Sequence, residues 1–141
     1  MKYLIGKYIM IFIFGFILGT VGMRVYLLLW PSSSAPAETT QASWYSRKEC
    51  ISTKNPNALM ANGEPLDDGA LTCASWDYSF GAKLRVVRPN NGHSVVVTVT
   101  DRGPAKRLYK DGRTLDLSRR AFLTLAPLEV GVIKVTFSKI K

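Results

Sequence analysis

Residues 94–104 read SVVVTVTDRGP, and this stretch decides how the rest of the sequence is interpreted. Valines at every second position from Val95 to Val99 alternate with a second set of side chains, which is the period of a β-strand. The strand runs directly into Asp101, and a Gly-Pro turn beginning at Gly103 stops it. A carboxylate fixed where a strand meets a loop is well placed to meet a ligand. The alternative is that Asp101 only caps the turn.

Further short strands are expected on both sides of this one. The dipeptide Asn91-Gly92 suits a tight hairpin, so residues 83–88 should pair with residues 94–100. The remaining expected elements are strands at 42–46, 70–74, 114–116 and 131–138, and a helix at 118–126 that Asp116 or Ser118 would cap. Long irregular segments separate them, above all residues 47–68. Several short strands with one short helix predict an all-β fold, a small closed barrel.

The first thirty residues differ in composition from everything that follows. From Tyr8 to Trp30 there are 23 residues with a single charge, Arg24, and this run is long enough to cross a bilayer. Two lysines precede it, so we expect a transmembrane signal anchor at residues 1–30, with the rest of the chain outside the cytoplasm. The alternative is a signal peptide cleaved after Ala37, which would release the domain.

Beyond the anchor, the composition indicates a linker and then one basic domain. Residues 31–41 read PSSSAPAETTQ and are expected to be linker, and residues 42–141 the folded domain. The chain carries a net charge of +9, with its basic residues dispersed. Such a charge favours anionic partners such as cell-wall polymers or lipid headgroups. No nucleic-acid-binding signature accompanies it, so nucleic acid is not an expected partner.

The two cysteines, Cys50 and Cys73, would lie in an oxidising compartment after export, and we expect them to form a disulfide. Two thiols with no histidine nearby in the sequence make a poor zinc site. We therefore expect neither a metal nor a cofactor. The single histidine, His93, follows the Asn-Gly turn and is expected to be an exposed loop residue.

Short motifs are spread in order over residues 42–138. They are ASWYS (42–46), MANGEP (60–65), ALT (70–72), FG (80–81), NG (91–92), SVVV (94–97), DRGP (101–104), GR (112–113), LDLS (115–118) and GV (131–132). Each alone is weak, but the series resembles the rare lipoprotein A (RlpA) family over nearly the whole exported part. The resemblance implies a six-stranded double-psi β-barrel.

The resemblance also implies action on peptidoglycan. Catalytic members of the family are lytic transglycosylases, which cleave between N-acetylmuramic acid and N-acetylglucosamine and leave a 1,6-anhydro ring. Asp101 matches the family's essential aspartate in DRGP, and Glu64 matches a second acidic position, so both are the expected catalytic residues. Where the family has a histidine, this chain has Ser75, whose side chain has no group that takes up or releases a proton near neutral pH. This departure favours the alternative, a non-catalytic glycan-binding or expansin-like wall-loosening module.

Four side chains are candidates for substrate binding. Ser75 retains a hydroxyl, Trp76 and Tyr78 offer aromatic faces to sugar rings, and Arg102 would bind a substrate carboxylate unless it pairs with Asp116. We expect the glycan strands of peptidoglycan as partner, attachment to the membrane through the N-terminal helix, and a monomer. A third possibility, a barrel that inhibits a protease or binds another partner, rests only on the versatility of such folds.

Overall fold

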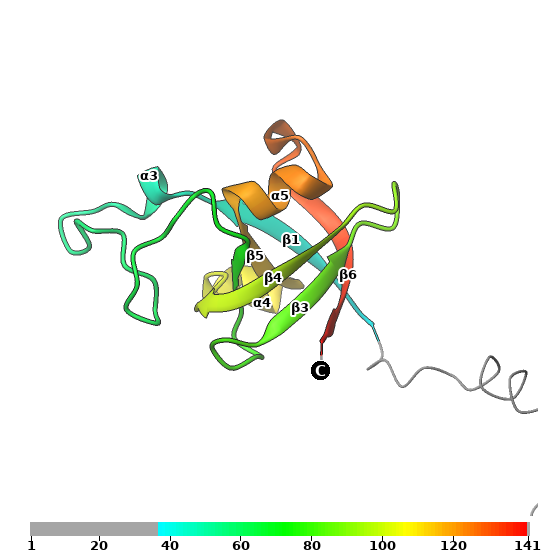
Figure 1. Cartoon of the computed structure of the whole chain (residues 1–141), viewed down its shortest axis with the longest axis horizontal. Coiled ribbons are helices and arrows are strands. Elements are labelled where there is room, and N and C mark those ends of the chain that lie inside the picture. The colour runs from blue at the N-terminus through cyan, green and yellow to red at the C-terminus, as the bar shows by residue number, and fades with distance from the viewer. Residues whose placement is uncertain (1–36, 141) are drawn as a thin grey trace, which may run out of the picture. The chain divides into compact units, whose positions relative to one another are not determined.

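The computed structural model describes residues 37–140. Its strands form a closed barrel in the order β1-β5-β2-β4-β3-β6 (Figure 1). The strands are β1 (Glu38–Tyr45), β2 (Thr72–Ala74), β3 (Lys83–Val87), β4 (Ser94–Asp101), β5 (Arg113–Ser118) and β6 (Val132–Lys139). Short helices lie between them: α3 (Arg47–Cys50), α4 (Lys106–Lys110), α5 (Arg119–Leu125) and the 3₁₀ helix η1 (Leu128–Val130). The mainly-β barrel predicted from the sequence is confirmed.

The N-terminal anchor predicted over residues 1–30 lies outside the described residues. Between residues 37 and 140, no helix has the length and apolar character needed to cross a bilayer. β1 begins at Glu38, inside the segment expected to be linker, because the threonines that follow it pair with β6. The Thr40 hydroxyl also donates a hydrogen bond to the Gly112 carbonyl at 2.9 Å. β-Branched threonine suits a paired strand, which explains the earlier start.

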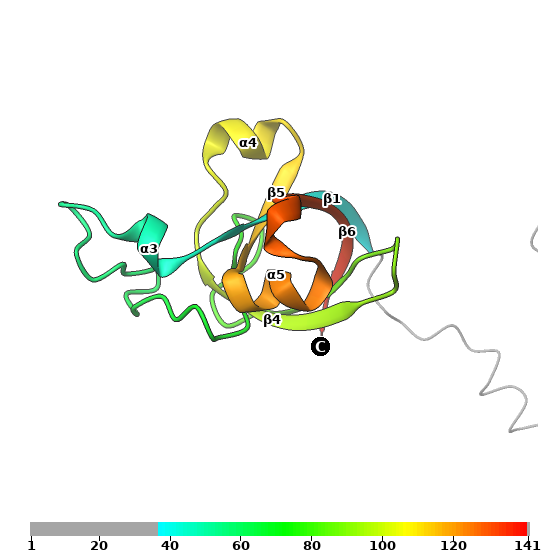
Figure 2. The ribbon, with the colours of Figure 1, turned by 90° about the horizontal axis from the view of Figure 1, so that it is seen from above.

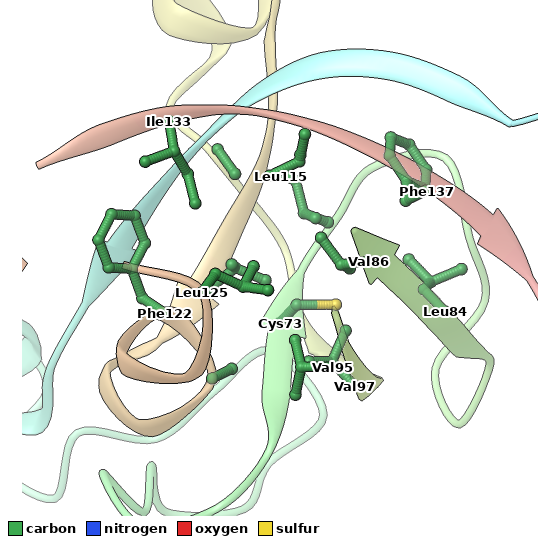
Figure 3. Packing of buried hydrophobic residues seen from close by; sticks show 14 of the residues in the cluster. Cys73, Leu84, Val86, Val95, Val97, Leu115, Phe122, Leu125, Ile133 and Phe137 are labelled. Carbon is green, nitrogen blue, oxygen red and sulfur yellow. The ribbon is translucent and has the colours of Figure 1, made fainter. Parts of the chain in front are cut away.

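β4 buries one face, as its alternating sequence predicts. Val95, Val97 and Val99 are 7%, 0% and 0% exposed, whereas Val96 is 38% exposed. Figure 3 shows Val95 and Val97 in one cluster with Leu115 of β5, and Val99 belongs to the same cluster. Fully burying a valine stabilises a fold by about 1.5–3 kcal/mol relative to leaving it exposed. This packing fixes β4 and thereby the position at which it ends.

Helix α5 closes one side of the core, and it corresponds to the helix predicted over residues 118–126. Phe122 and Leu125 are buried in the core cluster (Figure 3). The Ser118 hydroxyl caps the helix by accepting a hydrogen bond from the Ala121 N–H at 3.4 Å. It also donates to the Ala70 carbonyl at 2.6 Å, which ties the helix start to the approach to β2.

Two connections contain helices that the sequence does not predict. α3 begins the long segment between β1 and β2, and α4 lies between the Gly-Pro turn and β5. Each is four or five residues long, too short for helical periodicity to show in the sequence. The segment of residues 46–71 projects from the barrel at the end where β4 terminates (Figures 1 and 2).

Candidate active site

Asp101 is the last residue of β4, and its half-buried carboxylate is held by backbone groups from two loops. Its Oδ1 accepts hydrogen bonds from the Ala61 N–H at 2.8 Å and from the Arg102 N–H at 2.7 Å. Its carbonyl accepts from the Ser75 N–H at 3.2 Å. Because Ala61 is 40 residues away in the sequence, this carboxylate joins distant segments as well as its own turn.

Glu64 lies on the loop that contacts Asp101. Gly63 makes the turn of this loop with a φ of +90°, a conformation that favours glycine. The Asn62 N–H donates to the Thr100 carbonyl at 3.2 Å, which anchors the loop on the final residues of β4. The Glu64 side chain is exposed, and its Oε2 accepts a hydrogen bond from Asn62 Nδ2 at 2.9 Å. The two predicted catalytic residues therefore come from one junction between loop and strand.

Ser75, at the family's histidine position, is buried beside Arg102. It is 1% exposed, and its hydroxyl accepts a hydrogen bond from the Asp77 N–H at 3.3 Å. The Arg102 guanidinium donates to the carbonyls of Ser75 and Tyr78 at 2.8 and 3.0 Å, and it lies 3.8 Å from the centroid of the Phe80 ring. Arg102 thus braces the loop of residues 75–80. The substrate contacts expected of Ser75 and Arg102 stay predictions.

Trp76 and Tyr78 contact different parts of the domain. Trp76 is 37% exposed, and its indole N–H donates to the Pro104 carbonyl at 2.7 Å. The Lys106 ammonium lies 3.5 Å from the centroid of the Trp76 ring. The Tyr78 hydroxyl donates instead to Glu38, at the start of β1. The Trp76 ring is therefore placed beside the DRGP turn, whereas the Tyr78 hydroxyl is bonded at the start of β1.

Asp116 has a further carboxyl close to Asp101, because paired residues on four neighbouring strands form a row across the barrel: Ser43, Asp116, Ala74 and Asp101. Ala74 of β2 has Asp101 of β4 as its partner on one side and Asp116 of β5 on the other. Ser43 of β1 is the next partner along, and its hydroxyl donates to Asp116 Oδ1. Neighbouring strands lie about 4.8 Å apart, so the backbones of Asp101 and Asp116 are about 10 Å apart.

The groups around Asp116 shift the pKa of its carboxyl in opposite directions. Burial raises the pKa of Asp116 above its ordinary value, and the negative charge of Asp101 raises it further. The Ser43 hydroxyl and the charge of Arg113 lower it, but the net direction is upward. Asp116 therefore keeps its proton to a higher pH than a solvated aspartate does.

Gly103 allows the DRGP turn to pack closely against Ala74 and Asp116. A Cβ added at Gly103 would lie 3.1 Å from the Ala74 Cβ and 3.6 Å from Asp116 Oδ2. The turn consequently passes directly over Ala74, and only a residue without a side chain fits there without displacing its neighbours.

From the sequence, Asp116 is expected only as a cap or as a partner for Arg102. The local signal for a further role is its place between Leu115 and Leu117, two apolar residues that the structure buries fully. Aspartate is depleted in strands, so one placed in the interior of a buried strand calls for an explanation.

The hydroxyl of Tyr45 is buried and has no hydrogen-bond partner among residues 37–140. Tyr45 follows Ser43 by two positions, so both side chains leave β1 on the same face. Burial raises the pKa of Tyr45, and the negative charges of Asp101 and Asp116 are among the further causes. The hydroxyl thus stays protonated and is a donor near both carboxyls. Unpaired buried donors are uncommon and cost about 1–3 kcal/mol.

The predicted disulfide is wrong, because Cys50 and Cys73 are both free thiols in the described part of the chain. Cys73 points from β2 into the core cluster (Figure 3), whereas Cys50 ends α3, in the segment that projects from the barrel (Figure 1). A side chain in the core cannot bridge to that helix without leaving its packing. Burial raises the pKa of Cys73 to about 12, and burial also raises the pKa of Cys50.

The family described as "Lytic transglycolase" matches residues 37–137. The chain belongs to this RlpA-like double-psi β-barrel family. The endolytic peptidoglycan transglycosylase RlpA of Pseudomonas aeruginosa is 38% identical over 94 residues, covering 67% of this chain and 25% of that protein. RlpA of Vibrio cholerae is 34% identical over 98 residues, covering 70% of this chain and 34% of that protein. The chain thus spans about a third or less of the length of these relatives.

Solved structures of other proteins share the barrel. Streptomyces papain inhibitor superposes with a TM-score of 0.57 at 24% identity, covering 77% of this chain and 98% of that chain. Apo expansin of Clavibacter michiganensis superposes with a TM-score of 0.54 at 25% identity, covering 75% of this chain and 51% of that chain. The likeness to the papain inhibitor shows the fold alone.

Proposed function

We propose that this chain is a peptidoglycan lytic transglycosylase that cleaves between N-acetylmuramic acid and N-acetylglucosamine and forms a 1,6-anhydro product. Membership of the family supports the reaction class. The observation that carries the proposal is the carboxylate of Asp101, fixed at the end of β4 by the N–H groups of Ala61 and Arg102. A general acid or base must be held rigidly to act at one glycosidic oxygen, and these bonds supply that rigidity.

One carboxyl group can run this reaction. As an acid it protonates the glycosidic oxygen, and as a base it then takes the proton from the 6-hydroxyl of the same sugar, which closes the ring. No water attacks, so a second carboxylate to activate water is not required. The hydrogen bonds to the Asp101 side chain from the described residues both reach Oδ1, which leaves Oδ2 to meet the sugar oxygen.

Glu64 and Trp76 support the reaction from either side of Asp101. Glu64 is an exposed carboxylate on the loop bound to β4, and its negative charge stabilises the positive charge that develops at the anomeric carbon. The exposed ring of Trp76 lies beside the DRGP turn and offers an apolar face to a pyranose ring. Lys106 beside that ring attracts the carboxylate of a muramic acid residue.

The test incubates the full-length chain with purified glycan strands stripped of their peptides and analyses the products by mass spectrometry. The wild-type chain should release fragments with anhydro ends, and Asp101→Asn should still be retained on glycan while its turnover falls at least about 100-fold. Glu64→Gln should lower turnover less, by roughly 10-fold. An Asp101→Asn variant that cleaves as fast as the wild type would rule out the assigned role.

A non-catalytic glycan-binding or expansin-like module is the second candidate. The observation that favours it is Ser75, a buried residue without a titratable group at the family's histidine position. His93 does not replace that histidine, because it lies exposed before β4, at the opposite end of the strand from Asp101. Retention of the wild-type chain on glycan without any new fragments would establish this alternative and end the first.

We place the barrel outside the cytoplasm, held by the predicted N-terminal anchor, because its proposed substrate is a cell-wall polymer. The apolar run from Tyr8 to Trp30 supports this placement. Digestion of intact spheroplasts with an added protease should remove the barrel while cytoplasmic proteins survive. Protection of the barrel under those conditions would contradict the placement.

A further inference from the structure

The carboxyl of Asp116 lies two strands from Asp101 and beside the same turn. We propose that Asp116 is the proton donor of the reaction and that Asp101 is the base, so that the two steps are divided between two carboxyls. This inference rests on the proposed function, because it concerns the same site and the same reaction.

The register of the strands places both carboxyls on one face. The pairing of β2 with β4 shifts register between Cys73 and Ala74, so that Thr100 is passed over and Ala74 pairs with Asp101. Asp116 is the partner of Ala74 on the other side, and paired residues on neighbouring strands extend their side chains to the same face. The turn at Gly103 contributes no side chain between them, and a Cβ there would lie 3.6 Å from Asp116 Oδ2. Oδ1 of Asp116 is engaged by the Ser43 hydroxyl, so Oδ2 is the oxygen that faces the turn.

The two carboxyls have different surroundings, which is how a pair of like groups acquires separate acid and base roles. Asp101 accepts two backbone hydrogen bonds, from Ala61 and Arg102. The charged and titratable groups that act on Asp116 are Arg113 on its own strand and Asp101 at the end of β4. On β1, Tyr45 is close enough for the negative charge of Asp116 to help raise its pKa. On β2, the residue paired with Asp116 is the uncharged Ala74. Burial is the largest influence and favours the protonated acid.

Two buried donors lie next to this pair without partners among residues 37–140, Tyr45 Oη and Arg113 Nε. Arg113 is also linked to Asp116, because its guanidinium donates to the Ser43 hydroxyl, which in turn donates to Asp116. A carboxyl that only capped a strand would need neither group. Donors of this kind can stabilise whichever carboxyl is ionised as the proton leaves Asp116.

The proposed step is balanced in atoms and electrons. Asp116 gives its proton to the glycosidic oxygen, and the electron pair of the breaking bond to the anomeric carbon stays with that oxygen. The 6-hydroxyl oxygen bonds to the anomeric carbon through a lone pair while its proton passes to Asp101. One proton is donated and one is accepted, and a proton moving through solvent from Asp101 to Asp116 restores the starting state. No oxidant, reductant or metal takes part.

The first test compares Asp116→Asn with Asp111→Asn in the full-length chain. Asparagine keeps the shape of Asp116 and still accepts the Ser43 bond, so the variant should keep its melting temperature and its retention on glycan. Turnover of Asp116→Asn should fall at least about 100-fold. Asp111→Asn makes the same substitution at an exposed residue at the end of α4 and should keep full turnover.

The pH dependence separates a proton donor from a structural residue. The donor must be protonated, so the wild-type rate should fall as pH rises through the pKa of Asp116. Ser43→Ala removes the hydrogen bond that lowers this pKa, so the fall should move to higher pH. The residual rate of Asp116→Asn should not decrease as pH rises through this range.

Each outcome decides between the two proposals. A wild-type chain that cleaves glycan, together with an Asp116→Asn variant within about threefold of it, overturns this inference and leaves the proposed function standing. A loss in Asp116→Asn of the same factor at every pH, or a Ser43→Ala profile that does not move, also overturns it. A wild-type chain that releases no anhydro fragments overturns the proposed function and this inference together.

Discussion

The barrel and the segment of residues 46–71 are held by different forces. The barrel is stabilised by side chains such as Val97, Leu115 and Phe122, which are fully buried between strands and helix α5. The segment is largely exposed, and backbone hydrogen bonds to β4 hold it, together with a few buried side chains such as Leu66. Hydrophobic burial gives the barrel its stability, whereas the segment depends on a small number of specific contacts.

The candidate site lies where these two regions meet. β4 supplies a carboxylate whose position the core fixes, and the segment supplies the Ala61 N–H that orients it. We therefore expect damage to the core to lower stability, and damage to the segment to lower activity while the barrel persists. The following predictions test this separation.

The two thiols give the largest expected contrast, because one belongs to each region. Cys73 is fully buried in the core with a pKa of about 12, so an alkylating reagent should reach it only after unfolding. Cys50 is only partly buried, and it should react at least about 100-fold faster in the native protein. The measurement is a time course by mass spectrometry at pH 8 without reductant. Denaturation should make both residues reactive, whereas a chain that gains no label in denaturant would contain the disulfide.

Truncation of the core should cost more stability than any other single change proposed here. Phe122→Ala removes a fully buried ring and should lower the free energy of unfolding by about 3–5 kcal/mol, measured by urea denaturation. Leu123→Ala is the matched control on the same helix, where the side chain is 43% exposed, and it should change that free energy by less than about 0.5 kcal/mol. Equal losses in the two variants would mean that α5 does not cover the core.

Truncation inside the segment should affect activity more than stability. Leu66 is 2% exposed and anchors the segment, so Leu66→Ala should cost about 2 kcal/mol and loosen the loop that carries Glu64. Turnover should fall roughly 10-fold at a temperature where the barrel remains folded. Leu59→Ala, at a 46% exposed position of the same segment, is the control. A Leu66→Ala variant with wild-type turnover would show that the segment does not position the site.

The sequence predicts the barrel better than it predicts the site. The alternation from Val95 to Val99 identifies β4 and its buried face, because that signal is local. Asp101 and Glu64 follow from the resemblance to the family, but the contact between their segments joins residues 40 apart and has no local signature. The local sequence shows Asp116 inside an apolar strand, but its position beside Asp101 depends on pairing with residues of other strands.

The error over the cysteines has a physical cause of its own. β2 is only three residues long, so alternation cannot show that Cys73 faces the core. The expectation of an oxidising compartment rests on residues 1–30. Such a compartment permits a disulfide, but it does not bring two side chains into contact.

The smallest expected effect is also the most specific test of the boundary between the two regions. Tyr45→Phe deletes a buried hydroxyl that has no partner within residues 37–140, so the free energy of unfolding should stay constant or rise by up to about 1 kcal/mol. Tyr78→Phe deletes a hydroxyl that is bonded to Glu38 and should lower it by about 0.5–1 kcal/mol. Turnover should move the opposite way, falling in Tyr45→Phe, whose hydroxyl lies near both carboxyls, and holding in Tyr78→Phe. A Tyr45→Phe variant that is the less stable of the two would mean that this hydroxyl serves the fold, and the donors around Asp116 would then lose their functional interpretation.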